Sequence, residues 1–305
     1  MIISAPKNIV DFLESRGLCL VVKDKKIEFR VLDKDPRSIC FDNDLQLMTI
    51  SAAGISDLSN YYNQIGLLQA FYRFIGSRSL EDNIFLLHGS AALSGNGKAI
   101  LFGDNGRSIG KTLSSMELAY QSRQYIGDEF IFLDTNSFEI FSDDGIPIHA
   151  RPEVREHFTK KHGTTIAGEF FSKQELGWQF AKRRELGAMV YVNFSEDEER
   201  CTELSQDVAK EYAMITLCAH LQKMFNPELD RFQFISQSDS GKAGHEQGAV
   251  IERAEVYDRI KPRLEHASVV IAKTVPSFEL FVNIPCHIPI FIDTIINNKV
   301  KNKLI

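Results

Sequence analysis

A glycine-rich stretch constrains the fold of this chain more than any other segment. It reads Leu101-Phe-Gly-Asp-Asn-Gly-Arg-Ser-Ile-Gly-Lys-Thr112. The residues before the loop, 99–102, are apolar, as in a buried strand, and residues 113–120 contain neither glycine nor proline, so a helix can continue there. The sequence therefore predicts a strand, a loop and a helix in that order. In this arrangement the backbone N–H groups of the loop and of the helix N-terminus can surround a phosphate with hydrogen-bond donors.

The end of the loop, Gly110-Lys-Thr112, is typical of a P-loop. We expect Lys111 to neutralise charge on the β- and γ-phosphates of ATP, and the Thr112 hydroxyl to hold Mg²⁺. The spacing departs from the usual G-x-x-x-x-G-K-[ST] pattern, because six residues separate Gly103 from Gly110 and three separate Gly106 from Gly110. An ordinary glycine-rich turn is the alternative. The residues predicted to contact the nucleotide phosphates are Gly103, Asn105, Gly106, Arg107, Ser108, Ile109, Gly110, Lys111 and Thr112.

An acidic pair follows in an apolar setting. Asp128 and Glu129 lie within Tyr125-Ile-Gly-Asp-Glu-Phe-Ile-Phe-Leu133. Burying a carboxylate among apolar side chains is unfavourable unless it meets a cation or hydrogen-bond donors. We therefore expect one of the two to bind Mg²⁺, directly or through water, and the other to take a proton from an acceptor hydroxyl. A solvent-exposed pair at the start of a strand is the alternative.

Two apolar runs upstream predict a β-hairpin. They are Ile84-Phe-Leu-Leu-His-Gly-Ser-Ala-Ala-Leu93 and residues 99–102, joined by Ser94-Gly-Asn-Gly-Lys98. An Asn-Gly pair between apolar runs is a strong turn signal. Such a hairpin brings His88 back toward the end of the strand that precedes the P-loop. His88 is therefore a candidate active-site residue, with a buried structural histidine as the alternative.

These features in this order resemble the HPr kinase/phosphorylase superfamily, and more closely the HPr-kinase-related kinases that include those phosphorylating lasso-peptide precursors. In that family a His-Gly pair, a hairpin, a P-loop with its helix and an acidic pair follow one another, as they do here between His88 and Glu129. The resemblance is specific over 85–133 and extends to 145–154 and 282–291. It implies an α/β (mixed α+β) fold, with a P-loop core like that of HPr kinase and PEP carboxykinase and a small N-terminal β-rich module.

The resemblance also implies roles for individual residues. Asp128 is the expected catalytic base, alone or together with Glu129, and His88 orients or tunes its carboxylate. Arg151 contacts the transferred phosphate, and Glu153 is a candidate second metal ligand. The implied catalytic residues are thus Asp128, His88, Lys111 and Arg151, and the implied Mg²⁺ ligands are Thr112, Asp128 and Glu129.

Two features depart from the family pattern. The P-loop has two additional residues, which we assign to Arg107 and Ser108, and the second acid is Glu129 where the family has aspartate. Arg107 can itself stabilise charge on the transferring group, as an arginine supplied in cis does. The chain has no counterpart of the glycine-rich HPr-binding segment, so HPr is not the predicted substrate.

Composition narrows the class of protein. The formal net charge of -6 argues against a nucleic-acid or anionic-membrane partner. No apolar run reaches the length that spans a bilayer, and the N-terminus lacks the pattern of a signal peptide. Five widely spaced cysteines resemble neither a disulfide framework nor a zinc site. Together these features predict a cytoplasmic protein with reduced thiols.

The domain boundary is expected near residue 80. Residues 1–80, with short strands over about the first fifty residues and a helix over 56–74, would form the N-terminal module of unknown role, and 81–305 the kinase domain. The polar, basic segment 159–187 is either a flap that contacts the acceptor or ATP, or a solvated surface loop. Further along, 188–194, 267–272 and 277–282 read as strands, and 206–224 and 249–260 as helices.

The leading functional prediction is an ATP- and Mg²⁺-dependent phosphotransferase. The family implies a hydroxyl acceptor, such as a serine of a peptide or a small metabolite, and a chain able to form homo-oligomers. One alternative is a nucleotide-binding regulatory module that does not transfer phosphate. Another is a phosphohydrolase or phosphorylase that runs the reverse chemistry.

Overall fold

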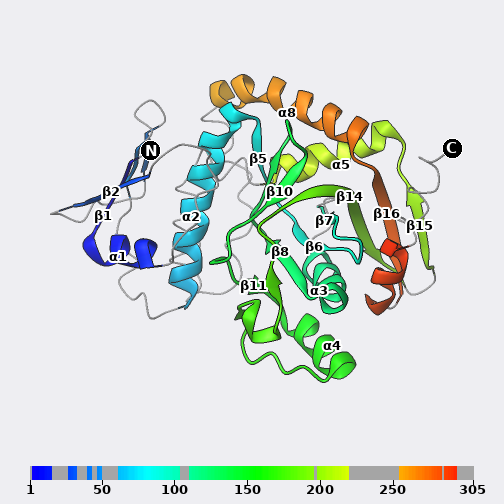
Figure 1. Cartoon of the computed structure of the whole chain (residues 1–305). Coiled ribbons are helices and arrows are strands. Elements are labelled where there is room, and N and C mark those ends of the chain that lie inside the picture. Colours follow the sequence, from blue (N-terminus) through cyan, green and yellow to red (C-terminus); the bar gives the residue numbers. More distant parts are fainter. Residues whose placement is uncertain are drawn as a thin grey trace. The chain divides into compact units, whose positions relative to one another are not determined.

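The computed structural model describes residues 2–15, 27–32, 40–42, 47–49, 61–103, 110–195, 198–219, 254–283 and 285–293. The fold is mixed α/β, as predicted, and the chain divides into two compact units (Figure 1). One unit holds the described residues up to Ile84 and the start of α8 (Ala254–Thr274) through Pro262; the other holds those of 85–219 and those from Arg263 on. In the described residues, no helix combines the length and apolar character needed to cross a membrane.

The first unit contains a four-stranded sheet in the order β2-β1-β4-β3. β1 (Ile2–Ala5) pairs in parallel with β2 (Glu28–Val31) and β4 (Leu47–Thr49), and β3 (Cys40–Asp42) is antiparallel to β4. α1 (Lys7–Ser15) follows β1 and buries Ile9, Val10 and Leu13. The sequence predicted only strands and turns here, so α1 is a correction to that prediction. α2 (Tyr61–Ser79) runs through Gly76, where we expected it to end, into the 3-10 turn η1 (Leu80–Asp82).

The second unit is built on a mixed, curled sheet of ten described strands (Figure 1). The main path has the order β13-β8-β6-β7-β14-β10-β9-β5, and β16 joins β14 to β15. The strands are β5 (Ile84–Leu87), β6 (Ser90–Leu93), β7 (Ala99–Phe102), β8 (Gln124–Asp128), β9 (Ile131–Asp134), β10 (Glu139–Phe141), β13 (Gln179–Phe180), β14 (Arg183–Phe194), β15 (Arg200–Glu203) and β16 (Ser277–Val282). A separate pair joins β11 (Ile148–His149) to β12 (Phe170–Phe171).

Pairing in the middle of this sheet brings several strand ends to one edge. β6 is antiparallel to β7 and to β8, and Ser90 lies opposite both Phe102 and Asp128. β7 and β8 therefore run in the same direction and finish at the same level. β14 is parallel to β7, so its carboxyl end lies at this edge too. In α/β sheets, ligands bind preferentially just outside such carboxyl ends.

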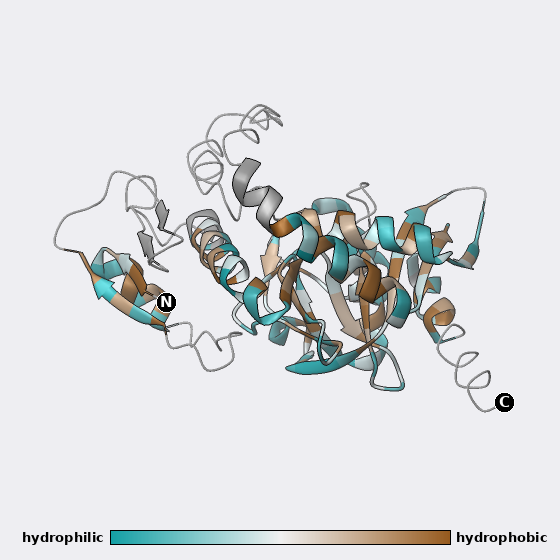
Figure 2. Ribbon diagram, turned by 90° about the horizontal axis from the view of Figure 1, so that it is seen from above, coloured by the Kyte–Doolittle hydropathy of each residue, from teal (hydrophilic) through white to brown (hydrophobic). Residues whose placement is uncertain are grey.

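Helices cover both faces of the sheet. On one face, α3 (Lys111–Ser122) packs with α4 (Pro152–His162) in an apolar cluster that includes Met116, Phe158 and Phe102. On the other, Tyr212 of α5 (Gln206–Cys218) meets Tyr191 of β14 edge to face, 4.8 Å between ring centroids. Figure 2 shows apolar strands between helices that carry hydrophilic residues. The short helical turns are η2 (Gln174–Leu176), η4 (Pro285–His287) and residues 288–293.

Some predictions of individual strands and helices are confirmed and others are wrong. The turn that joins β6 to β7, the strand before and the helix after the glycine-rich stretch, and the strands at 188–194 and 277–282 are confirmed. The first run of the expected hairpin, 84–93, forms two strands, because β5 ends at Leu87 and β6 begins at Ser90. The strand expected at 267–272 is wrong, because these residues continue α8. The segment 159–187 is more regular than expected: it includes the end of α4, β12, η2, β13 and the start of β14. The first residues of the helix expected over 56–74 lie outside the described part of the chain.

Candidate functional site

The two ends of the glycine-rich loop are held against β14. Gly103 follows β7, and its N–H donates to the Val190 carbonyl at 3.1 Å. A Cβ at Gly103 would lie 2.7 Å from the Tyr191 ring, and one at Gly110 would lie 2.5 Å from the Phe194 ring. Gly110 also has a φ of +94°, which favours glycine. Close packing therefore requires glycine at both positions, and at Gly110 the backbone conformation favours it as well.

Five residues predicted to contact the phosphates lie outside the described residues. They are Asn105, Gly106, Arg107, Ser108 and Ile109. The described chain resumes at Gly110, the N-cap of α3, and this helix begins at Lys111, two residues before the predicted run 113–120, so Lys111 and Thr112 are its first two residues. Because Gly110 has no side chain to cap the helix, its position leaves room for an anion at the helix N-terminus.

The acidic pair meets this helix start. The Thr112 hydroxyl donates to Asp128, with Oγ1 lying 3.1 Å from Oδ1 and 3.3 Å from Oδ2. The backbone N–H of His149 donates to Asp128 Oδ2 at 3.2 Å. The sequence predicted that Thr112 and Asp128 act on the same ion, and the fold brings their side chains into contact. The part played by the His149 amide had no signal in the sequence.

The environment of Asp128 changes its proton affinity. The side chain is 3 % exposed, and burial, reinforced by the negative charge of Glu129, raises its pKa from 3.8 to about 6. Hydrogen bonds from the His149 amide and the Ser90 hydroxyl oppose that rise. A carboxylate with a pKa slightly below neutrality is ionised at pH 7 and still accepts a proton readily, as a general base must.

Glu129 lies at a strained turn. Its φ is +64°, a conformation that costs an L-residue free energy, and the Phe130 N–H donates to the Asp128 carbonyl at 2.7 Å. This i→i+2 hydrogen bond closes a three-residue turn of the rare γ type. The turn ends β8 at Asp128 and redirects the chain into β9. Strain of this kind is often found where a side chain must be aimed at a functional site.

His88 and Arg151 are placed near this edge by the backbone. His88 follows β5, and its N–H donates to the Thr216 carbonyl at 3.3 Å. The next residue approaches β7 closely, because a Cβ on Gly89 would lie 2.9 Å from the Phe102 carbonyl oxygen. The chain at His88 and Gly89 thus lies beside the end of β7, as predicted. Arg151 is exposed at the N-cap of α4, two residues after His149, and Glu153 is exposed in the first turn.

Two further groups fix the segment that carries His149. His149 Nε2 lies 3.0 Å from Glu169 Oε1, and its ring stacks on Phe170. The Lys173 ammonium, 1 % exposed, donates to the carbonyls of Asp144 and Ile146 at 3.1 and 3.2 Å. Burial lowers the pKa of Lys173. Sequence reasoning missed both groups because neither lies in a motif.

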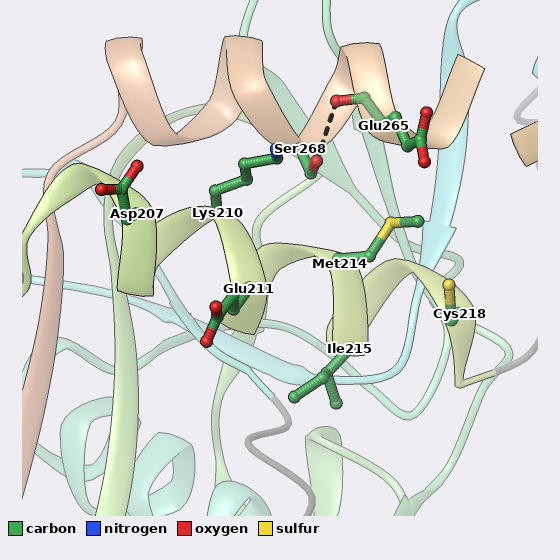
Figure 3. A pocket seen from close by; sticks show the side chains of 8 residues that line it. All are labelled: Asp207, Lys210, Glu211, Met214, Ile215, Cys218, Glu265 and Ser268. Atoms are coloured by element: carbon green, nitrogen blue, oxygen red, sulfur yellow. Dashed lines mark hydrogen bonds between the residues drawn. The ribbon is translucent and has the colours of Figure 1, made fainter. Parts of the chain in front are cut away.

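A groove of about 750 Å³ lies elsewhere in the second unit, between α5 and α8 (Figure 3). Met214, Ile215 and Cys218 of α5 line it together with charged residues such as Lys210. On the α8 side, the Ser268 hydroxyl donates to the Glu265 carbonyl at 2.9 Å. No residue predicted to act in phosphate transfer lines this groove, so it is separate from the site around Asp128.

The chain was compared with known proteins: no model of a protein family matches it, and no curated protein does either. Within the described ranges, no group of three or more His, Cys, Asp or Glu side chains is arranged to hold a metal ion by itself. The candidate site is thus defined by its own geometry. Thr112, the residue after Lys111 at the start of α3, contacts Asp128, the residue before Glu129 at the end of β8.

Proposed function

We propose that this protein is an ATP- and Mg²⁺-dependent phosphotransferase that acts on a hydroxyl group, related to the HPr-kinase-like kinases. The observation that carries the proposal is the contact of Thr112 Oγ1 with both carboxylate oxygens of Asp128. The N-terminus of a helix that follows a glycine-rich loop can bind phosphate, and a buried carboxylate can accept a proton or bind a metal ion. Their direct contact favours one shared reaction centre.

The nucleotide would bind at the start of α3. The N–H groups of its first turn favour an anion, and Lys111 would neutralise charge on the β- and γ-phosphates. Gly103 and Gly110 support this role, because each packs a side-chain-free backbone against β14 and so holds the ends of the loop in place. Arg151, exposed at the N-cap of α4, would contact the transferred phosphate.

The donor set suits Mg²⁺. A hydroxyl and carboxylates are the hard oxygen ligands that this ion prefers, and it is commonly held by one or two carboxylates together with substrate phosphates. Thr112 Oγ1, Asp128 and Glu129 would hold it, with no all-protein cage required. The ion would offset negative charge on the phosphate oxygens during transfer.

Asp128 would act as the base. The acceptor hydroxyl gives its proton to the carboxylate, its oxygen forms a bond to the γ-phosphorus, and the bond from that phosphorus to ADP breaks with its electron pair leaving on ADP. One carboxylate oxygen of Asp128 would contact Mg²⁺ and the other would accept the proton. In the chain without Mg²⁺, burial raises the pKa of Asp128 and so increases its affinity for the proton. We infer from the family resemblance alone that the acceptor is a serine of a peptide or a small metabolite. The wide spacing of the five cysteines favours a reaction in the cytoplasm.

The test measures ATP binding and transfer of labelled phosphate to serine-containing peptides and small hydroxyl compounds. Asp128→Asn should keep the ATP Kd within about threefold and lower kcat by about a hundredfold or more. Lys111→Ala should weaken ATP binding by about tenfold or more. Lys98→Ala and Asp134→Asn are matched controls for the two charges, and neither residue belongs to the site.

Three results would contradict the proposal in different ways. Binding of ATP with no transfer to any acceptor or to water would favour the regulatory module. Loss of label from a phosphorylated acceptor, with no forward transfer, would favour the reverse chemistry. Failure to bind ATP would mean that the longer glycine-rich loop is an ordinary turn.

A further inference from the structure

Three buried hydroxyl groups meet behind the contact between Thr112 and Asp128. They belong to Ser90 of β6, Ser115 of α3 and Tyr125 of β8, and all three residues are fully buried. Ser90 Oγ lies 2.8 Å from Tyr125 Oη and also hydrogen-bonds to Ser115 Oγ, which lies 3.0 Å from Tyr125 Oη. Each hydroxyl of this triangle therefore contacts the other two.

The hydroxyl triangle is connected to both partners of the candidate site. The Ser115 hydroxyl donates to the Thr112 carbonyl at 2.9 Å, in the first turn of α3. The Ser90 hydroxyl donates to the carbonyl of Gly127, the residue before Asp128, at 3.4 Å, and Ser90 lies directly opposite Asp128 in the sheet. One network thus reaches the Thr112 carbonyl in the first turn of α3 and the Gly127 carbonyl beside Asp128 at the end of β8.

A β-bulge makes this arrangement possible. Tyr125 and Asp128 are three positions apart, so a regular strand would point them to opposite faces of the sheet. The pairing of β6 with β8 shifts between Ala91, which opposes Gly127, and Ala92, which opposes Tyr125. Ile126 is therefore an extra residue on β8, and the bulge brings Tyr125 and Asp128 to the same face. Bulges of this kind re-aim side chains next to active sites.

Burying three hydroxyls here indicates a positional role. Apolar side chains of similar size would fill the same space without hydrogen-bond requirements, whereas a closed polar network fixes one arrangement of its members. The Tyr125 ring is itself held in place, because it stacks on Trp178 with 5.6 Å between centroids and an interplanar angle of 19°. Its hydroxyl is therefore held in one position, where it hydrogen-bonds to Ser90 of β6 and to Ser115 of α3.

We propose that Tyr125 is a positioning residue, whose hydroxyl acts through Ser90 and Ser115 to set the spacing between Thr112 and Asp128. This inference rests on the proposed function in one respect, that phosphate transfer needs this spacing. The effect of Tyr125 on the spacing can be tested without measuring activity. Tyr125 touches neither nucleotide nor acceptor in this account. It acts by joining the start of α3 to the end of β8.

The first experiment measures amide hydrogen exchange in the full chain. Tyr125→Phe removes only the hydroxyl, and should speed exchange in the first turn of α3 and at 148–150 by about fivefold or more. Tyr191→Phe is the matched control, because Tyr191 is also a fully buried tyrosine on a strand of the same sheet. Unchanged exchange in Tyr125→Phe would overturn the proposal, whether or not the wild type transfers phosphate.

The second experiment measures kinetics with Mg-ATP and the acceptor identified for the wild type. Tyr125→Phe should lower kcat by about 10- to 100-fold while the KM for ATP stays within about threefold, and Ser115→Ala should do the same. Tyr191→Phe should keep wild-type values. A wild-type kcat in Tyr125→Phe, or an equal loss in Tyr191→Phe, would overturn the proposal. An inactive wild type would contradict the proposed function and leave the exchange result to decide the positioning role.

Discussion

The Thr112 hydroxyl donates to both carboxylate oxygens of Asp128, at 3.1 and 3.3 Å, across sixteen residues of sequence. The contact exists because β7 and β8 flank β6 and finish at the same edge, opposite Ser90. α3 begins at this edge and carries the chain away from it, and β8 then returns the chain to the edge at Asp128. The burial of Asp128 and its hydrogen bonds determine how the site should respond to pH and to mutation.

Asp128→Asn should stabilise the protein at pH 8 but not at pH 4, without nucleotide or Mg²⁺. The pKa of Asp128 rises from 3.8 to about 6 on folding, so the folded state binds the proton more tightly than the unfolded chain. The favourable contribution is complete below pH 4 and is lost as the pH rises to about 6, a change of up to about 3 kcal/mol. Asparagine carries no charge at either pH.

Thermal unfolding at pH 4, 6 and 8 checks this prediction. Asp134→Asn, at the less buried end of β9, is the control and should show no comparable gain at pH 8. A difference between Asp128→Asn and wild type that stays constant with pH would contradict the burial of an ionised Asp128.

Glu129→Gly should stabilise the fold and impair the proposed transfer. Glycine adopts the φ of +64° without the steric cost that glutamate bears, which is worth about 0.5–1 kcal/mol after the larger entropy loss of glycine. Loss of the carboxylate should lower kcat by about tenfold or more. Arg123→Gly, with a φ of +58° at the C-cap of α3, should relieve strain in the same way and leave kcat unchanged. Equal activity in Glu129→Gly and wild type would remove Glu129 from the site.

Gly110→Ala should cost more stability than an alanine at another left-handed glycine. Its Cβ would lie 2.5 Å from the Phe194 ring, so overpacking adds about 1–3 kcal/mol to a backbone cost of about 1–2 kcal/mol. Gly177→Ala, with a φ of +68° and no atom within 4 Å of its Cβ, measures the backbone cost alone. Denaturant unfolding compares the two, and Phe194→Leu should partly restore Gly110→Ala. Equal costs at the two glycines would show that Phe194 moves aside freely.

Glu117→Leu should detach α4 from α3. The Glu117 carboxylate, 2 % exposed, lies 2.7 Å from His157 Nε2 and 3.1 Å from His162 Nε2. Leucine leaves both imidazoles without this acceptor, which we expect to cost about 2–4 kcal/mol. Glu156→Leu, whose carboxylate pairs with Lys160 on the exposed face of α4, should change stability by less than about 0.5 kcal/mol. Similar unfolding midpoints for the two variants would mean that the histidines find other acceptors.

Local signals in the sequence account for the elements around the glycine-rich loop. The Asn-Gly turn closes as expected, because Gly97 has a φ of +80° and the Ser94 N–H donates to the Lys98 carbonyl. The helix indicated over 113–120 is present and begins two residues earlier, at Lys111. These elements depend on turn chemistry and short-range apolar patterns, which single sequences carry.

Other parts of the site depend on long-range pairing that no local pattern encodes. The role of Tyr125 requires the bulge at Ile126, and an extra residue in a strand has no distinct composition. The positive φ of Glu129 contradicts its residue type, so nothing in the sequence marks it. α1 and the run at 267–272 show the same limit, because short apolar, β-branched segments suit a strand or a buried helix equally well.

Trp178 makes the intrinsic fluorescence of the chain a probe of the candidate site. It is the only tryptophan of the chain, it is 3 % exposed, and it stacks on Tyr125. All indole fluorescence therefore originates one aromatic ring away from the hydroxyls that hold Thr112 and Asp128 in register. A ligand that moves Tyr125 relative to Trp178 should shift that emission, so binding to the native chain can be followed without an attached dye.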